Sequence, residues 1–294
     1  MRLNLTSAPT ALKLWRQRAC FMLLSVLTMN NACANHLPLW EVRAGVSAGH
    51  LPYYRGSDES HNFIFPFPYF IYRGERIRAS DEGVKGFLYS SERVNIDISL
   101  AAGLPARSSE NGPRAGMPPL NTTLELGPSL EINLWKNAEM KQAIWFVTPL
   151  RAAFSFDDFT PHHEGEVISP YLIWLAKSNS YRTSISAGPM FASANYHNYF
   201  YGVTPNYATA SRSAYSADAG YSGTRITLGL TQQQHNAWFG VFVRYDRLDN
   251  AQFENSPLVQ RKDYFAAGAV FTWRLFESRE RAKHEEDALE PRQR

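Results

Sequence analysis

Residues 124–134 read LELGPSLEINL, and apolar residues alternate there with small, polar or charged ones. Leu124, Leu126, Leu130 and Ile132 share one side of an extended chain, while Glu125 and Glu131 share the other. A period of two residues is typical of a β-strand with one apolar face. The same alternation returns in residues 225–231, 238–245 and 264–275. The sequence therefore predicts an all-β protein whose sheet has one oily side and one polar side.

An N-terminal export segment helps to choose between two readings of this alternation. The apolar side is the core in a soluble sandwich, but it contacts lipid in a membrane barrel. Residues 1–34 contain basic residues without acids, then an apolar run over residues 19–29, then Ala32-Cys33-Ala34. This is the order of a secretory signal peptide, and we expect cleavage after Ala34. A lipoprotein signal ending at Cys33 is the alternative, although Asn30 stands where a Leu-like residue is expected.

The composition of the predicted mature chain excludes several functional classes. Both cysteines lie in the export segment, so we expect neither a disulfide framework nor a thiol nucleophile. The export segment takes four basic residues and no acidic ones, which leaves 26 Lys and Arg against 27 Asp and Glu. The mature protein is therefore close to neutral, and no nucleic-acid partner is expected.

The strand pattern predicts an antiparallel transmembrane β-barrel over residues 35–276, with about twelve strands and ten as the alternative. Short turns alternate with longer connections, as they do when both termini lie in the periplasm. The connection near Asp81 and Glu82 breaks this rule and makes the third and fourth strands the least certain. The expected strands are 39–49, 60–72, 76–80, 83–90, 94–103, 121–134, 142–154, 166–176, 181–192, 224–232, 236–246 and 263–275.

The last expected strand has the spacing of a barrel's closing strand. Gly268, Phe271 and Trp273 reproduce the Gly-x-x-hydrophobic-x-aromatic spacing that the barrel-assembly machinery is expected to read. Residues 277–294 follow with mixed charge and are interpreted as a charged, solvated periplasmic tail, with a helix considered around residues 279–289.

Two motifs suggest chemistry, but their context favours a structural role. Residues 45–49 (GVSAG) match the G-x-S-x-G elbow of hydrolases, in which a serine such as Ser47 is the nucleophile. The elbow requires a strand-to-helix turn, whereas these residues lie inside an alternating strand. Residues 162–166 (HHEGE) lack the spacing of a helical metal site and are expected in a solvated loop. We therefore predict no catalytic, cofactor-binding or metal-binding residue.

Charged residues on the inward side of the strands are the candidate site. Opposite charges in a narrow lumen are expected to pair and stiffen the barrel. A selectivity ring of a small pore is the functional alternative. The predicted lumen-lining residues are Glu41, Arg43, Asp97, Glu125, Glu131, Arg182, Arg225, Arg244 and Arg274.

A tyrosine-rich segment over residues 196–221 leaves three roles open. It can form a binding surface, fold inward as a plug, or rest at the level of the lipid headgroups.

The chain resembles the MipA/OmpV family of outer-membrane proteins over nearly the whole predicted mature region. The resemblance is carried by YRGSDE, PFPY, YRG, GMP, ELGPSL, SAGP, YFYGV, FVRY and SPLV at residues 54–59, 66–69, 72–74, 116–118, 125–130, 186–189, 199–203, 242–245 and 256–259. The extension after Phe276 departs from the family pattern, since members usually end at the last strand.

The resemblance implies a non-catalytic barrel in the outer membrane of a Gram-negative cell, surrounded by lipid. It also implies a scaffold that joins a lytic transglycosylase to a murein synthase. A narrow porin-like channel for small solutes is the alternative. A hydrolase resting on Ser47 is a third, weaker hypothesis.

Overall fold

A computed structural model describes residues 37–74, 77–80, 83–105, 112–137, 141–282 and 289–291. The predicted signal peptide lies outside these ranges. Within them, no helix is both long enough and apolar enough to cross a bilayer.

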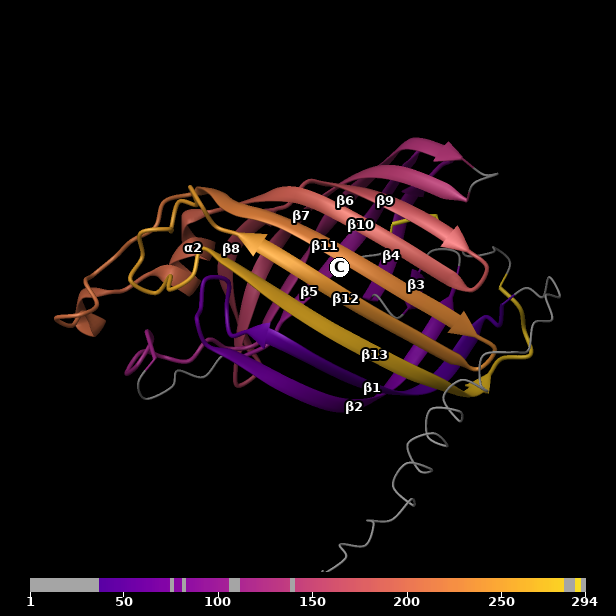
Figure 1. The fold of residues 1–294 in the computed structure, drawn as a ribbon, viewed down its shortest axis with the longest axis horizontal. Helices are drawn as coiled ribbons and strands as arrows, with labels where there is room; N and C mark the ends of the chain where they lie inside the picture. Colours follow the sequence, from indigo (N-terminus) through magenta and orange to yellow (C-terminus); the bar gives the residue numbers. More distant parts are fainter. Residues whose placement is uncertain are drawn as a thin grey trace, which may run out of the picture. The chain divides into compact units, whose positions relative to one another are not determined.

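The described chain is almost entirely antiparallel sheet (Figure 1). The strand bounds agree with the expected ranges to within a few residues at most positions. They are β1 (Trp40–Pro52), β2 (Ser60–Arg73), β3 (Ile77–Ser80), β4 (Gly83–Ser90), β5 (Val94–Gly103), β6 (Thr123–Asn137), β7 (Gln142–Asp157), β8 (Thr160–Ile168), β9 (Tyr171–Ser178), β10 (Tyr181–Ala192), β11 (Gly220–Gln234), β12 (Ala237–Arg247) and β13 (Asp263–Glu277).

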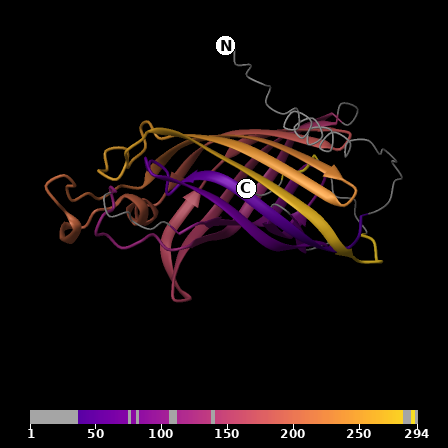
Figure 2. The ribbon, with the colours of Figure 1, turned by 60° about the horizontal axis from the view of Figure 1, so that its bottom comes forward.

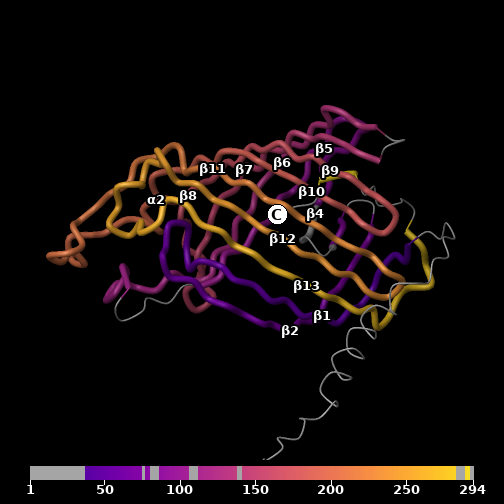
Figure 3. The backbone as a smooth tube through the Cα atoms, viewed as in Figure 1, coloured from indigo at the N-terminus to yellow at the C-terminus, as the bar shows by residue number. Residues whose placement is uncertain are grey.

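The sheet closes on itself because the first strand pairs with the last. β1 pairs with β2 on one edge and with β13 on the other, and the β1–β13 register runs from Glu41↔Glu277 to His50↔Ala267. Closure satisfies the backbone groups that an open edge would leave unpaired, which a spanning sheet requires in lipid. The tube in Figure 3 follows this continuous wall.

Twelve positions make up the wall because β8 and β9 share one position. Both pair with β7 on one side and with β10 on the other. The sequence predicted one strand at 166–176, but Pro170 lacks the N–H group that a ladder needs and interrupts it. The predicted loop at 155–165 is also wrong: β7 and β8 form a long hairpin that turns at Asp158 and Phe159, both with positive φ. This hairpin projects beyond its neighbours in Figure 2.

The two ends of the barrel differ in their connections. The short-turn end contains the links between β4 and β5, β9 and β10, and β11 and β12. The long-loop end contains residues 53–59, 104–105, 112–122, 193–219 and 248–262. One long loop forms α2 (Ala194–Tyr201) and the 3-10 helix η2 (Pro205–Tyr207), which were not predicted. Ser193 caps α2 by accepting a hydrogen bond from the Tyr196 backbone N–H.

The outer and inner faces of the wall have opposite chemistry. Leu228 and Leu275 on the outer face are about half exposed, at 49% and 53%. On the inner face Glu41, Asp97 and Glu131 are buried. This arrangement inverts that of a soluble protein, in which large apolar side chains are buried and charges are exposed. It is the arrangement of a transmembrane barrel.

Candidate functional site: the interior of the barrel

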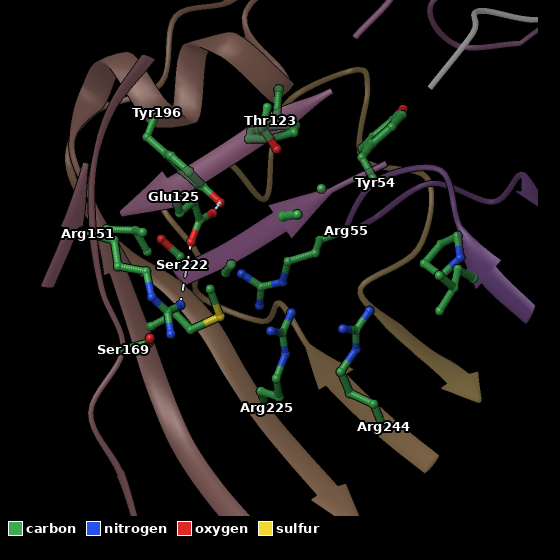
Figure 4. A pocket seen from close by; sticks show the side chains of 18 of the residues that line it. Tyr54, Arg55, Thr123, Glu125, Arg151, Ser169, Tyr196, Ser222, Arg225 and Arg244 are labelled. Carbon is green, nitrogen blue, oxygen red and sulfur yellow. Dashed lines mark hydrogen bonds and ion pairs between the residues drawn. The ribbon is translucent and has the colours of Figure 1, made fainter. Parts of the chain in front are cut away.

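A cavity of about 330 Å³ lies inside the barrel at its long-loop end. Strands from around the whole wall contribute to its lining, including β1, β5, β7 and β10 to β13. Tyr196, Phe200 and Tyr201 of α2 also line it, so part of the tyrosine-rich segment folds over the lumen. Figure 4 shows charged side chains from several strands converging on this space.

Three arginines surround a single carboxylate at one side of this cavity. Asp246 Oδ1 lies 3.1 Å from Arg55 Nε and 2.9 Å from Arg225 Nε, and Asp246 Oδ2 lies 3.1 Å from Arg244 Nε. The Asp246 side chain is 0% exposed, whereas the Arg225 and Arg244 side chains keep 32% and 26% of their surface. We call Arg55, Arg225, Arg244 and Asp246 the arginine cluster.

Strand register explains how the cluster forms. Arg225 of β11 is the direct cross-strand partner of Asp246 in β12. Arg244 lies two residues before Asp246 and therefore projects from the same face. Arg55 reaches the carboxylate from the loop after β1, 191 positions away in the chain. Three cations against one anion leave the cluster with two excess positive charges.

A fourth arginine lines the cavity but has its own partner. Arg151 Nη1 lies 3.6 Å from Glu125 Oε2, and Arg151 Nε donates a hydrogen bond to Ser99 Oγ at 2.8 Å. The Tyr196 hydroxyl donates to Glu125 Oε1 at 2.9 Å. Burial and the neighbouring Glu125 charge raise the pKa of Tyr196 well above its usual value, so the phenol remains a donor. Glu125 is thereby held by two partners from different elements.

Helix α2 and the adjoining loops hold Arg55 in place. The Tyr201 ring stacks on Phe253 with centroids 3.6 Å apart. The Tyr201 hydroxyl donates to the Arg55 backbone carbonyl at 2.9 Å. Burial alone would lower the pKa of Arg55, but the Asp246 charge and nearby tyrosines raise it above its usual value. Arg55 therefore stays charged although it is mostly enclosed.

A second group of charges fills the short-turn end. Glu41 lies 2.6 Å from Arg43 Nη2 and 2.7 Å from Arg73 Nη1, and Arg43 also donates to Thr272 Oγ1 at 3.3 Å. Leu289 is buried against a cluster that includes Trp145. Trp145 Nε1 donates to the Leu289 carbonyl at 2.7 Å. The described tail residues 289–291 thus differ from the expected solvated tail, because Leu289 finds an apolar site inside the barrel.

The predicted charged residues divide between these two regions. Arg225 and Arg244 belong to the arginine cluster, and Glu125 lines the same cavity. Glu41 and Arg43 form the ion pair at the opposite end. The remaining four residues lie on the inner face and have partners. Asp97 and Glu131 are buried. Arg182 donates a hydrogen bond to the Glu290 carbonyl at 2.7 Å, and Arg274 lies 2.6 Å from Glu277. Their role as lumen-lining charges remains a prediction.

Sequence reasoning missed Arg55, Arg151 and Asp246. Asp246 has the same strand phase as Arg244, which is a signal that could have identified it. Asp246 was not selected because it is the last residue of the predicted strand, where side chains are expected at the rim of the barrel. Arg151 alternates with apolar neighbours in β7 and could have been found in the same way. Arg55 lies in a loop, where no periodicity places a side chain.

The two chemical motifs contribute no assembled site. Ser47 lies inside β1, as predicted, and its hydroxyl donates to the Phe65 carbonyl at 3.3 Å. His162 and His163 lie in β8 rather than in the predicted loop, because the β7–β8 hairpin continues to residue 160. His163 Nε2 is 3.3 Å from Glu166 Oε1. Among the described residues, no group of three or more His, Cys, Asp and Glu could hold a metal ion.

Fold and interior together define a class of protein, the closed outer-membrane-type β-barrel of twelve strand positions. Residues 44–275 match the family described as "MltA-interacting protein MipA". The chain belongs to this family, as the residue matches had indicated. No curated protein sequence matches the chain.

The solved structures that match this chain share little sequence with it. The COG4313 outer membrane channel from Pseudomonas putida F1 shares 12% identity, with 84% of this chain and 100% of that chain covered and a TM-score of 0.37. A bacterial polysaccharide outer membrane secretin shares 10% identity, covering 82% and 100%, at a TM-score of 0.38. The outer membrane protein OprG from Pseudomonas aeruginosa shares 10% identity, covering 82% and 98%, at 0.22.

Proposed function

We propose that this protein is a non-catalytic outer-membrane scaffold that binds peptidoglycan-remodelling enzymes at its short-turn end. The family description, which names an interaction with MltA, supports a lytic transglycosylase as one partner. A murein synthase is the second partner that the resemblance implies. The observation that carries the proposal is the filled short-turn end of the lumen, where buried ion pairs and Leu289 occupy the interior.

A filled lumen favours a role on the outside of the barrel. Charges that are paired and buried cross-link the wall and stiffen it. A rigid wall presents its turns in fixed positions, which is what a docking surface for a partner needs. The short turns themselves offer exposed polar side chains, such as Glu92 and Arg93.

The scaffold function requires that the protein lie in the outer membrane with its short-turn end toward the periplasm. A cleavable signal over residues 1–34 would deliver the chain to the envelope of a Gram-negative cell. The barrel-assembly machinery would then insert it among outer-membrane lipids. With both termini in the periplasm, the short-turn end would face the peptidoglycan layer.

An affinity experiment tests the scaffold. The tagged full chain is recovered from solubilised envelopes, and the co-purified proteins are identified by mass spectrometry. We expect a lytic transglycosylase to co-purify, and to be lost when Glu92 and Arg93 are both replaced by alanine. The matched control, Phe159→Ala at the opposite end of the barrel, should retain it. Recovery of no murein enzyme above background would reject the scaffold.

A narrow channel for small solutes is the second candidate, favoured by the arginine-lined cavity in the lumen. Planar-bilayer recordings discriminate between the two. Discrete conductance steps would support the channel, whereas a flat trace from correctly folded protein would remove it.

A further inference from the structure

We propose that the cavity under α2 is a binding site for a small organic oxyanion, whose carboxylate or phosphate group sits against the arginine cluster. The inference rests neither on the scaffold function nor on conduction, since it requires only that the lumen hold a ligand.

The charge balance of the cavity is the first argument. Arg55, Arg151, Arg225 and Arg244 line it, and the carboxylates that contact them are Glu125 and Asp246. Two positive charges therefore lack a counter-charge from the residues in contact with them. Enclosed charges are costly unless they are paired, so an anion entering the cavity would offset this cost. Mutual repulsion among three arginines around one carboxylate also favours an additional anion.

Hydrogen-bonding capacity left unused inside the cavity is the second argument. Arg55 Nη2 and the Tyr264 hydroxyl are buried, and neither has a hydrogen-bond partner among the described residues. Both residues line the cavity. Arg244 Nε does not belong with them, because it lies 3.1 Å from Asp246 Oδ2, a buried acceptor that also lacks a hydrogen bond among the described residues. Buried polar groups are nearly always satisfied by protein, water or ligand. These donors therefore mark a place for an acceptor.

The shape of the donors selects the chemistry of the ligand. Guanidinium groups present N–H donors in a planar fork that matches the two oxygens of a carboxylate or a phosphate. In Figure 4 the guanidinium groups of Arg55, Arg225 and Arg244 lie near one another and point into the same space. A carboxylate or phosphate group could contact more than one of them at once. A halide lacks the separated acceptor atoms that this arrangement would use.

Apolar side chains in the cavity lining indicate that the ligand carries an organic group. These apolar and aromatic residues include Leu120, Met190, Phe200 and Tyr171. Pockets for small organic molecules are mostly apolar with a few convergent polar groups, and they start at about 300 Å³. A cavity of about 330 Å³ is therefore large enough for a small ring or short chain attached to an anionic group.

Calorimetric titration of the folded full chain in a non-ionic detergent tests this site, with phenyl phosphate as the probe and a buffer free of sulfate and phosphate. We expect saturable binding of one molecule per chain. Arg225→Gln and Arg244→Gln should each weaken binding by about tenfold or more, because each removes a charge-assisted hydrogen bond. The matched control is Arg274→Gln, which removes an inner-face arginine at the short-turn end and should change affinity less than twofold.

Competition separates the sources of binding energy. Benzoate should displace phenyl phosphate, while benzyl alcohol, which has the ring without the charge, should not. The site is overturned if phenyl phosphate shows no saturable binding, or if folded Arg225→Gln and Arg244→Gln bind like the wild type. If benzyl alcohol bound wild-type protein as tightly as phenyl phosphate does, the anion site would be overturned without any need for the variants. Inorganic phosphate binding equally tightly would overturn the assignment of an organic ligand.

Discussion

His197 is a fully buried titratable side chain on α2, and its contacts identify its protonation state. Its Nδ1 lies 2.6 Å from the Asp218 carbonyl, to which it must donate, and its Nε2 lies 2.5 Å from Ser222 Oγ. A neutral ring that is protonated on Nδ1 satisfies both contacts. Burial, and to a lesser degree the charge of Arg55, lowers the pKa of His197 below its ordinary value.

This lowered pKa predicts a loss of stability in mild acid. The unfolded chain binds a proton at His197 near pH 6.5, whereas the folded chain resists protonation until a lower pH. The destabilisation caused by His197 is therefore absent well above pH 6.5. It grows as the pH falls from 6.5 toward the pKa of His197 in the folded chain. Urea unfolding in micelles between pH 7.5 and pH 5 should show the decline. In His197→Gln the same pH interval should change stability less, and an equal decline in both proteins would contradict the assignment.

At the residue scale, strand phase predicts which side chains face inward but not which of them meet. Alternation was enough to place Arg225 and Arg244 on the inner side of their strands. The carboxylate between them was missed because Asp246 ends its predicted strand. Arg55 could not be found at all, since its contact with Asp246 spans 191 positions and depends on how a loop folds over the rim. Periodicity contains no information about such contacts.

At the scale of elements, the pattern failed where both faces of a strand contact the same environment. Residues 160–163 of β8 are all exposed, because the β7–β8 hairpin extends beyond the wall. Because both faces of this segment contact solvent, its sequence does not alternate apolar and polar residues, and the pattern predicts a polar loop. Helix α2 was missed for a different reason. Its eight residues include four aromatic side chains, of which Tyr196, Phe200 and Tyr201 line the lumen cavity, and they do not form one apolar stripe.

The contact of the tail with the interior gives a prediction at this scale. Val147 belongs to the buried cluster that Leu289 completes at the short-turn end. Removing residues 289–294 should expose that cluster. In a chain with Cys20 and Cys33 replaced by serine, Val147→Cys should react with a water-soluble maleimide severalfold faster in the truncated protein than in the full-length one.

The matched control for this labelling is Ala266→Cys, because Ala266 is equally buried but lies toward the long-loop end of β13. Truncation should leave its labelling rate unchanged. A Val147→Cys rate that is equal with and without residues 289–294 would show that the tail does not cover the cluster.

At the scale of the whole molecule, closure of the barrel followed from simple features of the sequence. Twelve alternating segments and the alternation of short and long connections predicted both the strand count and the common end of the first and last strands. The register of β1 against β13 confirms that the first strand begins at the end of the barrel where the last strand finishes. The pairing has one irregularity, between Val42 and Arg43. The sequence did not reveal how the lumen is filled, since α2 and residues 289–291 enter it from connections and a tail without a strand pattern.

The orientation of the two faces is the assumption on which every proposed role depends, and one substitution tests it. Leu228 lies near the middle of β11 on the outer face. If that face contacts acyl chains, Leu228→Arg should destabilise the barrel in lipid vesicles by about 2–4 kcal/mol, the cost of a cation near the bilayer midplane. Guanidinium titration followed by tryptophan fluorescence measures this difference. Leu228→Phe, which keeps an apolar surface, should stay within about 0.5 kcal/mol of the wild type. An arginine tolerated as well as phenylalanine would mean that water covers this face, because a half-exposed position in water accepts either residue.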